Sequence, residues 1–353
     1  MTTASADEQT HIGRKKRRRH RGRWITLAVI VGIVVLVGGF VTSITPWPSA
    51  LVIRAVFERS GAATAAEMAP YVPDADLRAT LDIQYGEGDA STTLDVFTET
   101  GPGDALPTVV WVHGGAWIAG AKEQVEPYLR ILATHGYTTI GVDYSLGPEA
   151  TYPTAVTQLN DALAYIAANA DELNVDASRI ILAGDSAGAQ LASQLATIIT
   201  NPRYAELLDV EPALAANQVE GIILNCGVYD LRAMAELQGL PAWGFKAALW
   251  AYTGTKDWSE QASGATMSTI QFVDADFPRT YISGGNGDGL TWLQSIPLSQ
   301  RLDELGVEVT EVFWPAPHAP QLPHEYQFHL DLPEAQEALA RTVEWLEDAT
   351  AGE

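Results

Sequence analysis

Cysteine is almost absent from this 353-residue chain. The single cysteine, Cys226, excludes an intrachain disulfide and a metal site built from several cysteines. It lies in an apolar run, which is typical of a small buried side chain on a strand. The sequence also lacks internal repeats and long low-complexity tracts, which argues against a repeat architecture.

Basic side chains are few and concentrated at one end. Residues 1–24 hold eight of the 21 Lys and Arg and two of the 44 acidic residues, which leaves 13 basic and 42 acidic side chains, a net charge of −29, in the remainder. Such a body repels nucleic acid and other polyanions. We therefore expect no nucleic-acid partner, although the basic tail by itself also fits a nucleic-acid or nuclear-import patch.

An uncharged apolar stretch directly follows the basic tail. As a helix, residues 25–44 would be about 30 Å long, which matches the hydrocarbon core of a bilayer. By the positive-inside rule, the tail stays in the cytoplasm and the body lies on the other side of the membrane. We expect an uncleaved single-pass anchor. The alternatives are a cleaved signal peptide that releases a secreted body, or a buried helix.

The rest of the chain alternates between strand and helix patterns. Short apolar runs are separated by helices of 10–16 residues, which predicts an α/β fold with a mainly parallel central sheet and helices on both faces. Residues 229–276 interrupt the alternation with many aromatic side chains, which indicates an inserted cap. The expected organisation is a basic cytoplasmic tail (1–24), a transmembrane helix (25–44), a linker or cap-associated segment (45–80) and a main domain (81–350).

The most informative motif is Gly-Asp-Ser-Ala-Gly at residues 184–188. By chance it would occur in about one chain in ten of this length, so its context matters. A predicted strand precedes it and an apolar helix follows, as in a nucleophile elbow. Ser186 would then sit on a strained turn, and the Ala187 N–H at the helix N-terminus would stabilise an oxyanion.

A second motif, His-Gly-Gly-Ala-Trp at residues 113–117, follows another predicted strand. Its two glycines let the backbone bring N–H groups close to a substrate oxygen, so we predict Gly114 and Gly115 as oxyanion donors beside Ala187. His113 is interpreted as a brace of this loop, with a role as the catalytic base as the alternative.

A serine nucleophile needs a base and an acid that orients the base, and here both should follow the serine. Asp288 directly follows a predicted strand and is the expected acid, with Asp230 as the alternative. His324 ends a proline-rich loop and is the expected base, with His318 as the alternative.

These motifs resemble the hormone-sensitive-lipase-like branch of the α/β-hydrolase superfamily over roughly residues 80–350. That branch carries His-Gly-Gly-Gly/Ala, then Asp-Tyr-x-Leu-x-Pro-Glu (residues 143–149 here), then Gly-Asp-Ser-Ala-Gly. This chain departs from the branch where Gly289 replaces proline after the acid and Glu325 replaces an apolar residue after the base. The resemblance assigns the nucleophile, acid, base and oxyanion donors to Ser186, Asp288, His324, Gly114, Gly115 and Ala187.

The resulting expectation is an esterase- or lipase-like serine hydrolase that cleaves small or lipid-like carboxylic esters through an acyl-enzyme. Such chemistry requires no metal and no organic cofactor. An acyltransferase or amidase with the same triad, or an inactive binding module on the same fold, are the alternatives. The sequence does not indicate an oligomeric state.

Overall fold

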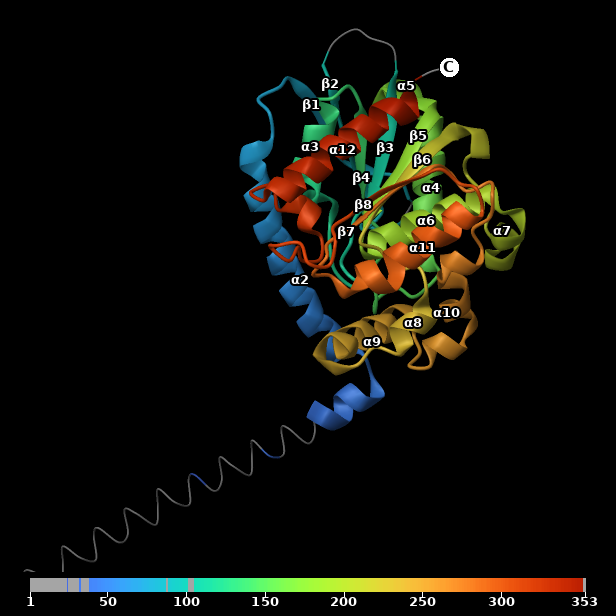
Figure 1. Cartoon of the computed structure of the whole chain (residues 1–353). Coiled ribbons are helices and arrows are strands. Elements are labelled where there is room, and N and C mark those ends of the chain that lie inside the picture. Colours follow the sequence, from blue (N-terminus) through green and yellow to red (C-terminus); the bar gives the residue numbers. More distant parts are fainter. Residues whose placement is uncertain (1–23, 25–31, 33–37, 87, 101–104, 352–353) are drawn as a thin grey trace, which may run out of the picture. The chain divides into compact units, whose positions relative to one another are not determined.

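The computed structural model describes residues 24, 32, 38–86, 88–100 and 105–351 (Figure 1). The chain divides into two compact units, residues 1–48 and 49–353. The second unit carries an eight-stranded sheet in the order β1-β2-β4-β3-β5-β6-β7-β8. The strands are β1 (Leu77–Gln84), β2 (Thr93–Glu99), β3 (Leu106–Val112), β4 (Thr138–Val142), β5 (Val175–Asp185), β6 (Val219–Asn225), β7 (Thr280–Gly284) and β8 (Val309–Phe313).

All neighbouring strands from β4 to β8 pair in parallel, whereas β2 is antiparallel to both β1 and β4. β1 and β2 form the hairpin expected near residues 81–97. β4 and β7 are buried along their whole length, because helices cover both faces of a parallel sheet. The prediction of an α/β fold with a mainly parallel sheet is therefore confirmed.

Alternate residues of each central strand point to opposite faces and enter two separate cores. On β3, Val109 and Trp111 join one core, while Val110 and Val112 join the other. Helices α3 (Glu126–Ala133) and α12 (Pro333–Thr350) cover the first face. The second face carries α4 (Thr154–Ala168), α6 (Ala187–Thr200) and α11 (Ile296–Glu304), with the short α5 (Ala170–Leu173) and α7 (Pro202–Leu208) nearby.

The aromatic-rich segment between β6 and β7 contains three helices that gather at one end of the sheet (Figure 1). They are α8 (Leu231–Ala235), α9 (Gly239–Thr253) and α10 (Ala262–Met267). These helices fall within the predicted cap, residues 229–276. Past β7, a π-helical turn at Thr291–Ser295 precedes α11, where a single regular helix over residues 290–305 was expected.

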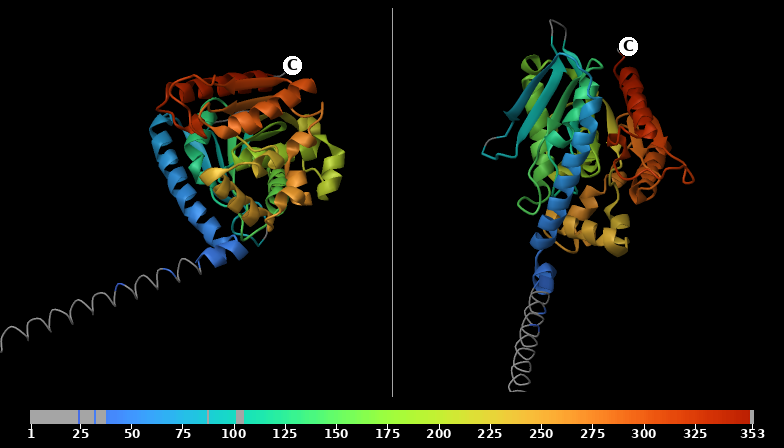
Figure 2. Two further views of the ribbon diagram at one scale, coloured as in Figure 1. Left: turned by 60° about the horizontal axis from the view of Figure 1, so that its bottom comes forward. Right: turned by 90° about the vertical axis from the view of Figure 1, so that its left-hand side faces the viewer.

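Residues 45–80, expected as a linker or cap-associated segment, contain a long helix that packs on the body. They form α2 (Trp47–Met68), a 3₁₀ turn (Ala69–Tyr71) and the start of β1. Figure 2 shows α2 running along the outside of the body. Ala50 and Ile53 pack with Ala116 and Ile118 and with alanines of α9, so this helix does contact the cap. Its sequence is rich in alanine, which is the best helix former, and no proline interrupts it after Pro48.

The predicted transmembrane segment, residues 25–44, lies largely outside the described residues. Within the described part of the chain, no single helix combines the length and the apolar character needed to cross a membrane. Gly38–Ile44 and Trp47–Tyr71 meet those criteria only together, as a bent pair.

Arg54 fastens α2 to the loop that follows β3. Its Nε donates to the Ile118 carbonyl oxygen (2.6 Å), and a terminal nitrogen donates to the Gly147 carbonyl oxygen (2.7 Å). The guanidinium also binds both carboxylate oxygens of Glu149, at 2.8 and 2.6 Å. A planar guanidinium can donate several hydrogen bonds in a fixed geometry. Arg54 therefore joins α2 to the loop at Ile118 and to the segment that holds Gly147 and Glu149.

We predict that Arg54→Met lowers the free energy of unfolding by about 2 kcal/mol, because two carbonyl oxygens and a carboxylate lose a charged donor. Urea denaturation of the purified protein measures this change. In Glu149→Gln, Arg54 keeps both carbonyl contacts and loses only a half-exposed ion pair, so the loss should stay below about 1 kcal/mol. Equal losses in the two variants would contradict the importance of the carbonyl contacts.

Candidate active site

Ser186 is the single residue between β5 and α6. Its φ of 50° and ψ of −116° lie in a region that non-glycine residues rarely adopt. The Ser186 N–H donates to the Asn225 carbonyl oxygen at the end of β6, at 2.8 Å. A Cβ on Gly188 would lie 2.0 Å from the Val112 carbonyl oxygen, so only glycine allows α6 to begin this close to β3. This geometry is that of the predicted nucleophile elbow.

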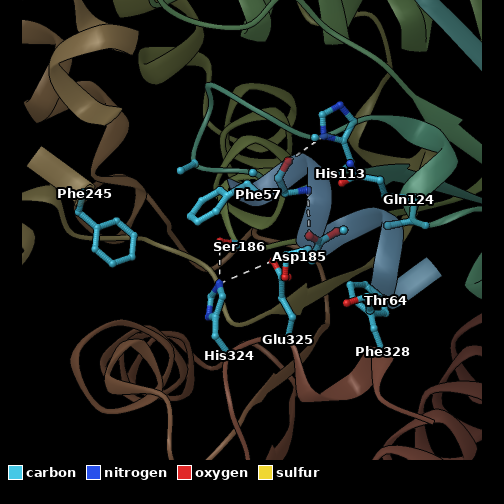
Figure 3. A pocket seen from close by; sticks show the side chains of 17 residues that line it. Phe57, Thr64, His113, Gln124, Asp185, Ser186, Phe245, His324, Glu325 and Phe328 are labelled. Carbon is cyan, nitrogen blue, oxygen red and sulfur yellow. Dashed lines mark hydrogen bonds and ion pairs between the residues drawn. The ribbon is translucent and has the colours of Figure 1, made fainter. Parts of the chain in front are cut away.

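Asp288 and His324 come from different loops and meet at Ser186. His324 Nε2 lies 2.9 Å from Ser186 Oγ (Figure 3), and His324 Nδ1 lies 2.6 Å from Asp288 Oδ2. Asp288 follows β7, and its other carboxylate oxygen accepts the Leu290 N–H at 2.9 Å. This hydrogen-bonded order of serine, histidine and aspartate is the arrangement in which a histidine can take the serine proton.

The alternative acid and base bind elsewhere. Asp230 caps α8 by accepting the backbone N–H groups of Arg232 and Ala233. His318 Nε2 pairs with Glu334 at 2.8 Å, and its ring lies against Trp314. The structure thus brings together the three residues that the sequence favoured, and these two alternatives have other structural partners.

His113 braces the loop after β3. Its Nδ1 lies 2.8 Å from the Gly114 carbonyl oxygen, and its Nε2 lies 3.4 Å from Asp143. The ring stacks on Tyr144, whose hydroxyl donates to the His113 carbonyl oxygen at 2.9 Å. Burial lowers the pKa of His113, but Asp143 outweighs burial and raises it above its usual range. These contacts fit the predicted bracing role and do not involve Ser186.

Gly114 differs from its predicted role. Its N–H donates to Asp185 Oδ2 at 2.8 Å, which argues against Gly114 as an oxyanion donor. Within the described residues, the N–H groups of Gly115 and Ala116 have no such protein partner. Gly115 has a φ of 113°, and a Cβ there would lie 2.1 Å from the Ala119 carbonyl oxygen. Ala116 thus joins Gly115 and Ala187 as a candidate donor.

The contacts of His324 favour its protonated form. Burial lowers the pKa of His324, but the hydrogen bond to the Asp288 carboxylate and the nearby Glu325 carboxylate oppose burial and hold that pKa above its usual range. Cys226 is fully buried, as the sequence indicated, and burial raises its pKa to about 11, so it stays a neutral thiol.

Asp185, the last residue of β5, is a buried carboxyl group in the wall of the site. Its Oδ1 accepts the Trp111 Nε1–H at 2.8 Å, in addition to the Gly114 N–H on Oδ2. Burial and the neighbouring Glu325 raise the pKa of Asp185 to about 7. In the sequence, Glu325 stands out only as a departure from the family pattern, and that departure is the available signal for this second carboxyl group.

Among the residues that the structure describes, two groups of side chains place potential metal ligands within 4.8 Å of one another. Cys226, Asp288 and His324 form the first, and a metal there would have to replace the hydrogen bond between His324 and Asp288. Glu67, His329 and Asp331 form the second, where His329 Nδ1 already lies 3.2 Å from Glu67.

A cavity of about 270 Å³ adjoins Ser186. Its walls come from α2, the loop after β3, α9 of the cap and the segment that follows His324 (Figure 3). The contribution of α2 to this cavity, through Phe57, Ser60, Gly61 and Thr64, was not predicted from the sequence.

Comparison with known proteins agrees with this fold. Residues 94–302 match the BD-FAE family. A protein of Acanthamoeba polyphaga mimivirus named as an alpha/beta hydrolase (R526) is 32% identical over 148 residues, which span 40% of this chain and 43% of that protein. Esterase B from Lactobacillus rhamnosis aligns with a TM-score of 0.72 at 24% identity, covering 86% of this chain and 96% of that one.

A Pyrobaculum calidifontis esterase aligns with a TM-score of 0.67 at 23% identity over 86% of this chain and 94% of that one. At this level of identity, the structural likeness shows the fold. The resemblance to the α/β-hydrolases that the motifs indicated is confirmed. Because the family match extends over more than half of this chain, the chain belongs to the BD-FAE family of α/β-hydrolases.

Proposed function

We propose that this α/β-hydrolase cleaves carboxylic esters with Ser186 as the nucleophile, His324 as the base and Asp288 as the acid. The observation that carries the proposal is the pair of hydrogen bonds at His324, 2.9 Å to Ser186 Oγ and 2.6 Å to Asp288 Oδ2. The names of the structurally similar proteins, which include esterases and a carboxylesterase, support an ester as the substrate class.

In the proposed mechanism, Ser186 Oγ attacks the ester carbonyl carbon as His324 Nε2 takes its proton. The N–H groups of Gly115, Ala116 and Ala187 stabilise the oxyanion of the tetrahedral intermediate. The imidazolium then gives its proton to the departing alcohol, which leaves an acyl group on Ser186. Water, activated by the same histidine, releases the acid and restores the serine.

We predict that Ser186→Ala lowers kcat for p-nitrophenyl ester hydrolysis by at least about 10³-fold, because the nucleophile is lost. The variant should also fail to react with a fluorophosphonate probe that labels the wild type. Ser193→Ala removes a buried hydroxyl from α6, the helix that follows Ser186, and should keep most of the activity. Retained hydrolysis in Ser186→Ala would refute the mechanism. A separate product assay with added acceptor alcohols distinguishes hydrolysis from acyl transfer.

The raised pKa of His324 predicts the acidic limb of the pH–rate profile. Only neutral His324 can accept the serine proton, so kcat/KM should fall as the pH drops through a value above 6.5. Asp288→Asn removes a carboxylate that favours the imidazolium, so the limb should move to lower pH while kcat falls. A limb that stays in place in Asp288→Asn would contradict the role of this aspartate.

We also propose that residues 25–44 anchor the protein in a membrane, with the tail in the cytoplasm and the body outside it. The uncharged run and the basic cluster before it support this topology. The early part of α2 adds exposed apolar side chains, with Leu51, Val52 and Val56 between 47% and 61% exposed. Such side chains are compatible with a bilayer surface.

On this topology, protease added to intact cells should degrade the acidic body, while a cytoplasmic marker protein in the same cells survives. Immunoblotting with an antibody against the body measures the loss. A body that resists the protease in intact cells and is degraded only after lysis would reverse the proposed orientation.

A further inference from the structure

Glu325 places a carboxyl group beside the reacting atoms. Its Oε1 lies 3.6 Å from His324 Nε2, the nitrogen that faces Ser186 (Figure 3). Glu325 adopts a φ of 57°, which is uncommon for a glutamate and carries an energetic cost. The side chain is 33% exposed and lines the cavity. A strained residue held in this position suggests a functional reason for its orientation.

A second carboxyl group, that of Asp185, lies close to Glu325. A Cβ built on Gly114 would lie 2.2 Å from Asp185 Oδ2 and 3.0 Å from Glu325 Oε1. Burial and the nearby Glu325 favour the neutral form of Asp185 by raising its pKa. Asp185 is 3% exposed and Glu325 is 33% exposed, so Glu325 is the more accessible carboxyl group for a ligand in the cavity.

Within the described part of the chain, no permanent cation faces Glu325 in the cavity. Among the described residues that line it, none is a lysine or an arginine. His324 is neutral in the form that activates Ser186, so it is not an ion-pair partner at that moment. The remaining walls include Phe57, Phe245 and Phe328, whose rings can interact favourably with a cation. A cationic group on the ligand would therefore contact both the carboxyl group of Glu325 and these aromatic rings.

The position of Glu325 also indicates which part of an ester it would meet. The departing alcohol oxygen takes its proton from His324 Nε2, so the alcohol part must lie near that nitrogen. A carboxylate 3.6 Å from Nε2 is therefore within reach of groups on the alcohol part.

We propose that Glu325 is a specificity-determining residue that favours esters whose alcohol part carries a positive charge, such as a quaternary ammonium group. The inference rests on the proposed ester hydrolysis at Ser186 and deepens it. Because the charge of a partly exposed carboxylate is screened by water and salt, the expected preference is moderate and weakens as ionic strength rises.

The test compares acetylcholine with 3,3-dimethylbutyl acetate, its neutral analogue of nearly the same shape, on the full-length protein. We expect Glu325→Gln to lower the ratio of the two kcat/KM values about tenfold. Glu337→Gln removes the same charge from an exposed position on α12, so it controls for the net charge of the acidic body and should leave the ratio unchanged.

An unchanged ratio in Glu325→Gln, or a wild-type ratio that does not respond to salt, would overturn the proposal. If the variant does not fold, the test uses the wild type alone. Choline and 3,3-dimethylbutanol are then compared as inhibitors of p-nitrophenyl ester hydrolysis. Stronger inhibition by choline supports the proposal, and equal inhibition refutes it. Hydrolysis that survives in Ser186→Ala would instead refute the proposed function, which separates the two failures.

Discussion

The hydrogen bonds of one buried carboxyl group, Asp185, hold the two motifs of the site in register. Asp185 directly precedes Ser186, and its side chain accepts the N–H of Gly114 in the other motif and the indole N–H of Trp111 on β3. Burying a carboxyl group is costly unless its oxygens are hydrogen bonded, so these donors fix where the loop after β3 can lie. The parallel pairing of β3 with β5, with Val112 opposite Gly184, brings the two strand ends together. The position of the oxyanion donors relative to Ser186 follows from this pairing and from Asp185.

The same loop is held from its other side by α2. Arg54 donates to the Ile118 carbonyl oxygen, and Ala50 and Ile53 pack against Ala116 and Ile118. Asp185 and Arg54 therefore constrain opposite ends of a short segment that contains Gly115 and Ala116. The helix α2 therefore has two roles at the site. It holds the loop after β3 in place, and it forms part of the cavity wall. Preorganised donors of this kind need little rearrangement when charge develops on a substrate oxygen.

The elbow was predictable because its requirements are local. A strained serine between a strand and a helix needs small neighbours, and Gly188 would clash with a backbone carbonyl if it carried a side chain. Asp288 and His324 were predictable from chain order and from their places after strands, although only the structure shows their hydrogen bonds to one another and to Ser186. The hydrogen bond that argues against Gly114 as an oxyanion donor could not be foreseen, because its acceptor, Asp185, lies 71 residues away. The hydrogen bonds of Arg54 were not predicted for the same reason. The local sequence pattern of α2 does not reveal a contact with Glu149, which lies 95 residues away.

Two acidic side chains, Glu325 and Asp185, lie beside the groups that would carry charge during the reaction. Ester cleavage through Ser186 would create an imidazolium at His324 and an oxyanion at the loop after β3, so a nearby negative charge favours the first and disfavours the second. Glu325 lies on the His324 side, 3.6 Å from Nε2, where its charge stabilises the imidazolium. Asp185 lies on the loop side, and its pKa of about 7 means that it holds a proton over much of the neutral and acidic range. Burial thus favours the neutral form of the carboxyl group on the loop side, where a negative charge would oppose the developing oxyanion.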